Sequence, residues 1–191
     1  MKKALSIVCC IVVAISMAAK QPKYIFYFIG DGMGLAPVLC AETYNRTVMQ
    51  TGEPLLMLQF PVASYATSYS HNNTITDSAA AGTALSTGHK TNNSALGVDA
   101  DGAPVTSVAK ELHDLGYGIA IATSVDPDDA TPGAFYAHVP KRNMYYDVAK
   151  DMARSGYDMF VGARLRGKAP EGEKDVKNHP HRGRLHHCQR P

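Results

Sequence analysis

Asp77 and Ser78 stand directly before a run of small side chains, and they are the first place where the sequence could perform chemistry. Residues 78–87 read SAAAGTALST, which predicts a helix that ends at Gly88. The free amide groups and the positive dipole end at the start of a helix favour an anion such as phosphate. A serine at that point would be placed to attack the bound group.

A serine hydroxyl is a weak nucleophile at neutral pH, so it needs a neighbouring base or a metal ion. Asp31 lies between glycines and offers a carboxylate that can bridge two cations. Asp129 and Thr131 add oxygen ligands of the kind that Mg²⁺ prefers. Arg142 could place its planar guanidinium on two phosphate oxygens. Together these residues indicate metal-assisted phosphoryl transfer.

Each of these residues also has an ordinary structural explanation when it is taken alone. Asp77 with Ser78 could simply begin a helix. Asp31 could belong to a plain turn, and Asp129 to another helix start. Arg142 could be a solvated surface charge. The combination therefore matters more than any single residue.

Two competing motifs do not fit. Gly82–Thr91 resembles a phosphate-binding P-loop, but its glycines are one residue too far apart and His89 separates the last glycine from the lysine. The pattern G-x-S-x-G is absent around Ser78, which argues against an esterase of the α/β-hydrolase type.

Several elements would have to bring these residues together. Lys23–Gly30 is a β-branched and aromatic run that predicts a buried strand ending just before Asp31. Beyond it, predicted helices alternate with predicted strands: helices at Pro104–Leu115, around Ala134–Val139 and at Met144–Ser155, and strands at Tyr117–Val125 and Tyr157–Val161. This alternation predicts an α/β fold with a largely parallel sheet, whose ligands lie beyond the carboxyl ends of the strands. Asp31 and the loop Asp126–Thr131 both fall there.

The length of 191 residues fits one globular domain or part of a larger one. Lys2 and Lys3 precede the apolar run Ala4–Ala19, which predicts a signal peptide at residues 1–19 because the run is shorter than the roughly 20 residues of a membrane span. We therefore expect a secreted or periplasmic protein that meets a membrane only during export.

Without the two lysines, basic and acidic residues are equal in number, so nothing favours nucleic acid as a partner. Cys40 and Cys188 do not predict a structural disulfide.

Three segments in chain order resemble the alkaline phosphatase family: YIFYFIGDGMG, then TDSAAAGTALSTGHKTNNSALGV, then DATPGAFYAHVPKR. The resemblance runs from about Lys23 to about Gly162. It implies that residues 20–162 form the N-terminal portion of a three-layer α/β sandwich with a largely parallel central sheet. It also implies a homodimer, since family members commonly form one.

The resemblance implies roles for three residues in the hydrolysis of phosphate monoesters. Ser78 would be the nucleophile that is transiently phosphorylated. Arg142 would hold the phosphate, and Asp77 would orient that arginine. In the implied mechanism, the Ser78 oxygen attacks phosphorus in line with the leaving oxygen, and water then hydrolyses the phosphoserine.

The resemblance also implies two zinc ions and one magnesium ion in each active site. Asp31 would be shared between one zinc and the magnesium. Asp129 and Thr131 would serve the magnesium site. One zinc would stabilise the serine alkoxide, while the other would receive the leaving oxygen.

The sequence departs from the family after residue 162. The family draws most of its zinc ligands from a second half of the chain that is not recognisable here. Asp175 and His179 reproduce part of a zinc-binding spacing, but Glu171 precedes Asp175 by one residue too few. Residues 163–191 are predicted to form an irregular tail. The sequence after Asn178 is basic and rich in histidine, which leads to the hypothesis that the reading frame breaks there.

We therefore expect this polypeptide alone to have little phosphatase activity and to fold poorly, because an incomplete sheet leaves apolar faces uncovered. Two alternatives stay open. One is a non-catalytic fragment that binds phosphate or one divalent cation. The other is a related metal-dependent phosphodiesterase or sulfatase.

Overall fold

A computed structural model describes residues 21–173 and 184–187. The predicted signal peptide, Asp175, His179 and the proposed break near Asn178 lie outside the described residues. No helix within those two ranges is long and apolar enough to cross a bilayer.

The chain divides into two compact units, residues 1–30 and residues 31–191. In the first unit, the predicted strand Lys23–Gly30 does not pair as a strand with any described residue, and its aromatic side chains are exposed, with Phe28 84% accessible. The prediction of a buried strand is therefore wrong here. Aromatic and β-branched residues favour extended backbone, but a strand also needs a neighbour that supplies its ladder hydrogen bonds, and none of the described strands does so.

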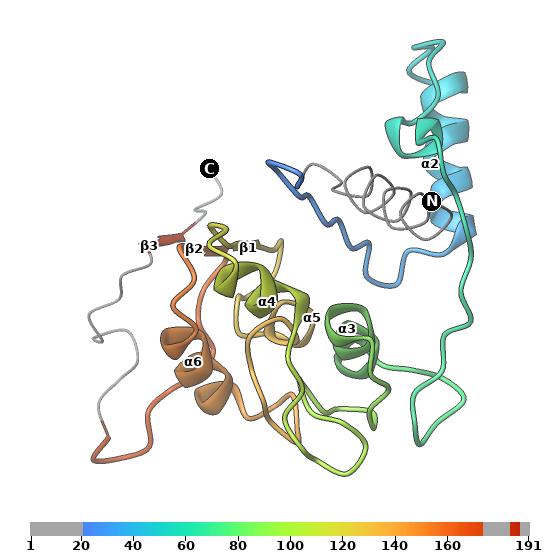
Figure 1. Ribbon diagram of the computed structural model, residues 1–191. Coiled ribbons are helices and arrows are strands. Elements are labelled where there is room, and N and C mark those ends of the chain that lie inside the picture. Colours follow the sequence, from blue (N-terminus) through green and yellow to red (C-terminus); the bar gives the residue numbers. More distant parts are fainter. Residues whose placement is uncertain (1–20, 174–183, 188–191) are drawn as a thin grey trace, which may run out of the picture. The chain divides into compact units, whose positions relative to one another are not determined.

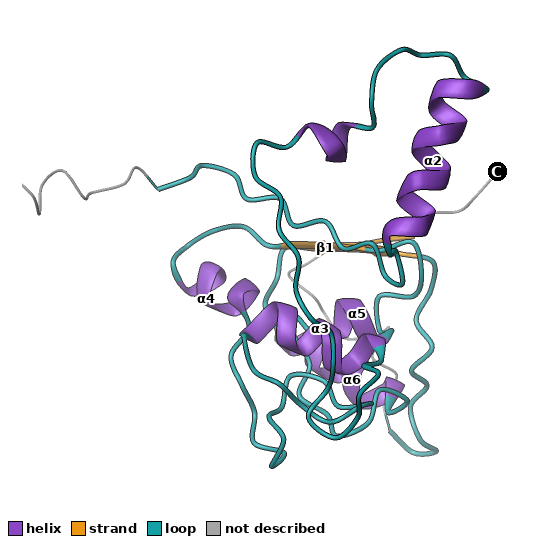
Figure 2. Cartoon of the chain, turned by 90° about the vertical axis from the view of Figure 1, so that its right-hand side faces the viewer, coloured by secondary structure: helices purple, strands orange, loops and turns teal. Residues whose placement is uncertain are grey.

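The second unit contains all the other described elements. They are α2 (Leu35–Thr47), the 3-10 helix η1 (Leu56–Gln59), α3 (Ser78–Thr87), α4 (Val108–Asp114), β1 (Ala120–Ala122), α5 (Ala130–Gly133), α6 (Tyr145–Arg154), β2 (Met159–Gly162) and β3 (Arg184–His187). The strands form one sheet in the order β1-β2-β3, and both pairs are parallel. Helices α3 to α6 lie on one side of this sheet (Figures 1 and 2). The predicted α/β fold with a parallel sheet is confirmed.

Helix α3 matches its predicted bounds because the residues that end it, Asp77 and Gly88, directly flank it in the sequence. Asp77 accepts a hydrogen bond from the Ala80 amide at 2.9 Å and so caps the N-terminus. Gly88 ends the helix in the left-handed conformation, with φ of 75°. Sequence alone therefore placed Ser78 at the first helical position.

The other predicted elements are shorter or shifted. Helix α4 begins at Val108 rather than Pro104, because the Ser107 side chain caps it. The predicted helix at Ala134–Val139 is wrong: α5 ends at Gly133, and Val139 instead forms an antiparallel bridge with Leu96. Helix α6 lies within the predicted range, and β1 and β2 are shorter than predicted.

Three elements were not predicted: α2, η1 and β3. Helix α2 has only Glu42 buried, so it lacks the apolar stripe by which a helix is recognised. Strand β3 lies in the tail that was predicted to be irregular, and it pairs with β2 in the register Phe160 with Leu185. No alternating pattern marks those four residues.

The core that positions the site is the contact between α3 and α5. Gly82 permits this contact, because a Cβ atom there would lie 3.0 Å from that of Ala134. The buried Ser86 hydroxyl donates to the Ala134 carbonyl at 2.7 Å and ties α3 to the chain just after α5. This contact holds the N-terminus of α3, which carries Ser78, at a fixed position relative to the N-terminus of α5, which carries Thr131.

Candidate active site

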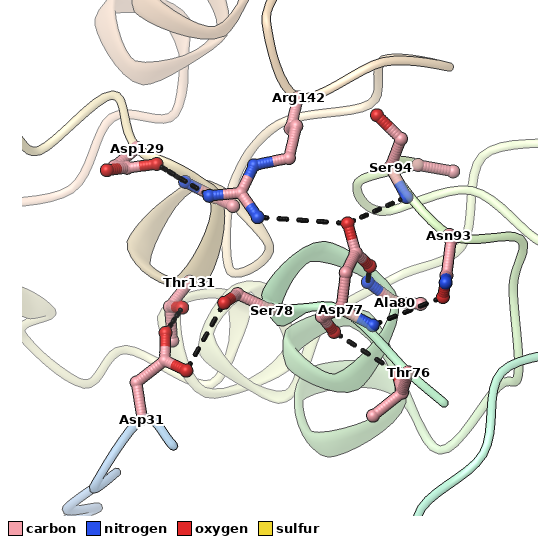
Figure 3. Close-up of polar contacts among 12 residues, drawn as sticks. Asp31, Thr76, Asp77, Ser78, Ala80, Asn93, Ser94, Asp129, Thr131 and Arg142 are labelled. Atoms are coloured by element: carbon pink, nitrogen blue, oxygen red, sulfur yellow. Dashed lines mark hydrogen bonds and ion pairs between the residues drawn. The ribbon is translucent and has the colours of Figure 1, made fainter. Parts of the chain in front are cut away.

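Ser78 opens α3, and its hydroxyl faces a carboxylate from a distant part of the second unit. Ser78 Oγ donates to Asp31 Oδ1 at 3.2 Å, and Thr131 Oγ1 donates to Asp31 Oδ2 at 2.7 Å (Figure 3). Asp31 is exposed, whereas Ser78 and Thr131 are half-buried. Asp31 therefore joins the start of α3 to the start of α5 and holds the serine oxygen in place.

Asp77 is fixed through both of its carboxylate oxygens. Oδ1 caps α3, and Oδ2 accepts from the Ser94 amide at 3.0 Å. The Asp77 amide itself donates to Asn93 Oδ1 at 3.2 Å. The segment that contains Asn93 and Ser94 thus holds Asp77 beside the nucleophile, a role that the sequence did not reveal.

Arg142 spans the gap between two carboxylates (Figure 3). Its Nη2 lies 3.1 Å from Asp129 Oδ1, and its Nη1 lies 3.7 Å from Asp77 Oδ2. Its backbone amide donates to the Ser94 carbonyl at 2.6 Å. The side chain remains 32% exposed, so part of the guanidinium is open to a ligand. Asp77 and Asp129 thus both lie beside the Arg142 guanidinium, and the role of Asp77 in orienting this arginine stays a prediction.

The six predicted site residues form two contact groups: Asp31 with Ser78 and Thr131, and Arg142 with Asp77 and Asp129. The two groups adjoin because Asp77 directly precedes Ser78 in the chain. Sequence reasoning missed Arg166, whose Nη2 lies 3.1 Å from Asp129 Oδ2. Hydrogen bonds to Asp126 and then to Tyr145 raise the pKa of Arg166 above its ordinary value, so the guanidinium stays charged. Its segment lacks periodicity, and no local signal could have singled it out.

The oxygen donors fit magnesium better than zinc. Asp31 and Thr131 present hard oxygens side by side, as Mg²⁺ prefers. Asp129 is already engaged at both oxygens, by Arg142 and by Arg166. Across residues 21–173 and 184–187, no three His, Cys, Asp or Glu side chains gather as a metal site would require. The predicted pair of zinc ions therefore stays a prediction.

Comparison with known proteins adds an independent finding. The family model described as alkaline phosphatase matches residues 22–164. An alkaline phosphatase of Gadus morhua is 31% identical over 186 residues, covering 82% of this chain and 39% of its own. Alkaline phosphatase 4 of Drosophila melanogaster is 29% identical, with 82% and 28% covered. The chain thus spans less than two fifths of the length of these relatives.

Solved structures agree with the curated relatives. The alkaline phosphatase of the Antarctic bacterium TAB5 superposes with a TM-score of 0.67 at 31% identity, covering 78% of this chain and 42% of its own. A mutant of that enzyme with magnesium bound in its M3 site gives a TM-score of 0.62 at 32% identity, with 71% and 37% covered.

Proposed function

Because this chain belongs to the alkaline phosphatase family, we propose that it contains the nucleophile and the phosphate-binding residues of a phosphomonoesterase. The observation that supports this most is the position of Ser78. Its hydroxyl lies at the N-terminus of α3 and donates a hydrogen bond to Asp31. The partly exposed guanidinium of Arg142 lies beside Asp77, the residue directly before Ser78.

The phosphate monoester would be bound by charge and by backbone dipoles. The first amide groups of α3 and its dipole attract the phosphate dianion. Arg142 would donate from its exposed edge to phosphate oxygens, while Asp77 and Asp129 keep the guanidinium plane in place. A lysine in place of Arg142 could not bridge these two carboxylates and the ligand together.

Ser78 would then act as the nucleophile. Its oxygen forms a bond to phosphorus as the bond to the ester oxygen breaks, and the hydroxyl proton is shared with Asp31. The alcohol leaves with the proton that Ser78 gave up, and water then hydrolyses the phosphoserine to release inorganic phosphate and restore the serine hydroxyl. Asp31 and Thr131 would hold a divalent cation, with Asp129 nearby, and that cation would lower the cost of negative charge on the reacting oxygens.

A single-turnover labelling experiment tests this proposal. The full chain is supplied with Zn²⁺ and Mg²⁺, mixed with ³²P-labelled 4-nitrophenyl phosphate, quenched in acid and mapped by mass spectrometry. We expect label on Ser78 that Ser78→Ala abolishes. Ser124→Ala, an exposed serine on another loop, should leave the label unchanged. Label at another residue, or label that survives in Ser78→Ala, would rule the proposal out.

The second candidate function is a non-catalytic domain that binds phosphate or one divalent cation. It is favoured because, among the described residues, no three His, Cys, Asp or Glu side chains gather around one point. Binding of inorganic phosphate without any acid-stable label would support it. A phosphodiesterase or sulfatase would instead hydrolyse a diester or a sulfate ester faster than a monoester.

We also propose that residues 1–19 are a signal peptide and that residues 20–162 act outside the cytoplasm, with a homodimer as the assembly. N-terminal sequencing of secreted material would show whether cleavage occurs after residue 19. The reading-frame hypothesis for the tail is tested by translating the encoding DNA beyond Asn178 in its other two frames.

A further inference from the structure

Acidic and basic side chains alternate in one continuous row that begins at the nucleophile's helix. Asp77 lies 3.7 Å from Arg142, and Arg142 lies 3.1 Å from Asp129. Asp129 lies 3.1 Å from Arg166, which in turn contacts the buried Asp126. Only the first two residues of this row belong to the predicted substrate-binding group, so the function of Arg166 is unassigned.

Arg166 is fixed along its whole length. Its backbone amide donates to Asp128 Oδ2 at 2.8 Å, and the amide of Gly167 donates to the same oxygen at 2.7 Å. Asp128 is fully buried. The guanidinium donates from Nε to Asp126 and from Nη1 to the Tyr145 hydroxyl at 3.0 Å, and it lies 5.1 Å from the Tyr145 ring centroid. A side chain anchored in this way supplies its remaining nitrogen, Nη2, in one place.

Arg166 Nη2 contacts one of the two carboxylate oxygens of Asp129. Asp129 Oδ2 faces Arg166 Nη2, while Oδ1 accepts from Arg142 at 3.1 Å and from the Ala130 amide at 2.7 Å. A carboxylate with both oxygens free would pair with Arg142 through two parallel hydrogen bonds. Such a fork would use both terminal nitrogens of Arg142 and would pull them away from Asp77.

We propose that Arg166 is a positioning residue for Arg142. By occupying Asp129 Oδ2, it limits Asp129 to a single hydrogen bond with Arg142, so that the other guanidinium edge stays available to phosphate. This inference rests on the proposed function, because it assigns Arg142 to the phosphate.

The sequence offers a matched control for the charge itself. Arg164 is two residues away, is 78% exposed, and lies 3.8 Å from the same Asp126 oxygen without contacting Asp129. Arg164→Ala and Arg166→Ala therefore remove the same charge from the same segment. A difference between them reports position rather than net electrostatics. Arg166→Lys keeps the charge but cannot reach Asp126, Tyr145 and Asp129 at once.

The experiment measures two quantities on the full chain by NMR: the Kd for inorganic phosphate and the Nε–H resonance of Arg142 without ligand. We expect Arg166→Ala to weaken phosphate binding by about tenfold, Arg166→Lys to weaken it less, and Arg164→Ala to change it by less than about twofold. The Arg142 resonance should move in Arg166→Ala and stay in Arg164→Ala. In an Asp129→Asn background, adding Arg166→Ala should have no further effect on either quantity.

The outcomes separate the inference from the proposed function. If Arg142→Ala leaves phosphate binding unchanged, or if the unmodified chain binds no phosphate, the proposed function fails, and the Arg142 resonance still reports on Arg166. If Arg166→Ala behaves like Arg164→Ala in both measurements, the positioning role is refuted. An undiminished effect of Arg166→Ala in the Asp129→Asn background would refute it as well. If Arg166→Ala does not fold, Arg166→Lys supplies the same comparison.

Discussion

At the residue scale, the site depends on side chains that connect α3 to the loop beside it. Thr83 is fully buried on α3; its hydroxyl donates to the Ala95 carbonyl at 3.4 Å and accepts from the Gly97 amide at 3.0 Å. The same loop supplies the Ser94 amide to Asp77 and the Ser94 carbonyl to Arg142. Thr83 therefore anchors the loop whose Ser94 backbone contacts both Asp77 and Arg142.

We expect Thr83→Val to cost about 1–3 kcal/mol of unfolding free energy, because it leaves the buried Gly97 amide without a partner at unchanged volume. Thr83→Ser keeps the hydroxyl and loses one methyl group, for about 1 kcal/mol. Urea denaturation followed by circular dichroism measures both. If valine is tolerated better than serine, the hydrogen bond is not what holds the loop.

At the element scale, predictions succeeded where the signal was local. Asp77 and Gly88 are adjacent to the helix that they end, so α3 was recognisable and Ser78 was placed correctly. Lys23–Gly30 failed because strand formation depends on a partner, and Ala134–Val139 failed because Val139 pairs with the distant Leu96. Arg166 could not be predicted for the same reason, since its contacts with Asp126 and Asp129 join parts of the chain about forty residues apart.

Helix α2 shows how one carboxylate can hold an element that buries little else. Glu42 accepts from Arg46 Nε at 2.6 Å and from the Leu55 amide at 2.9 Å, which ties α2 to the segment before η1. The hydrogen bond from the Leu55 amide and then that from Arg46 lower the pKa of Glu42 below its ordinary 4.5. The folded state therefore favours the charged carboxylate.

A pH dependence follows from this lowered pKa. The contribution of Glu42 is present above the ordinary glutamate pKa of 4.5, and it is lost as the pH falls through the lower value of the folded state. We expect the NMR shift of the Leu55 amide to titrate with a midpoint below 4.5, and Glu42→Gln to remove that transition. Glu53→Gln, an exposed neighbour, should preserve it. A midpoint at or above 4.5 would contradict the tether.

At the scale of the whole molecule, the two arginines of the site are paired with carboxylates of the chain itself, and the carboxylates outnumber them. Arg142 and Arg166 together face Asp77, Asp129 and Asp126, which leaves Asp31 as the carboxylate of the site that no arginine approaches. Its neighbours are two hydroxyls, from Ser78 and Thr131. A divalent cation would therefore be drawn to Asp31 first, because only there is a carboxylate without a cationic partner among the described site residues.

This distribution predicts how many metal ions the chain retains. The family resemblance implies two zinc ions, yet Asp31 is the one carboxylate of the described site that has no arginine partner, and no three His, Cys, Asp or Glu side chains gather among the described residues. We therefore expect fewer than two zinc ions per chain after dialysis, measured by elemental analysis. The tail histidines can bind zinc nonspecifically, so a variant with His179, His181, His186 and His187 changed to Gln is the control. Asp31→Asn in that variant should remove the remaining divalent cation, since the two hydroxyls are weak ligands without it. Two zinc ions retained by the variant that lacks the tail histidines would show that the described donors are sufficient, and the view of Asp31 as the single uncompensated ligand would have to be abandoned.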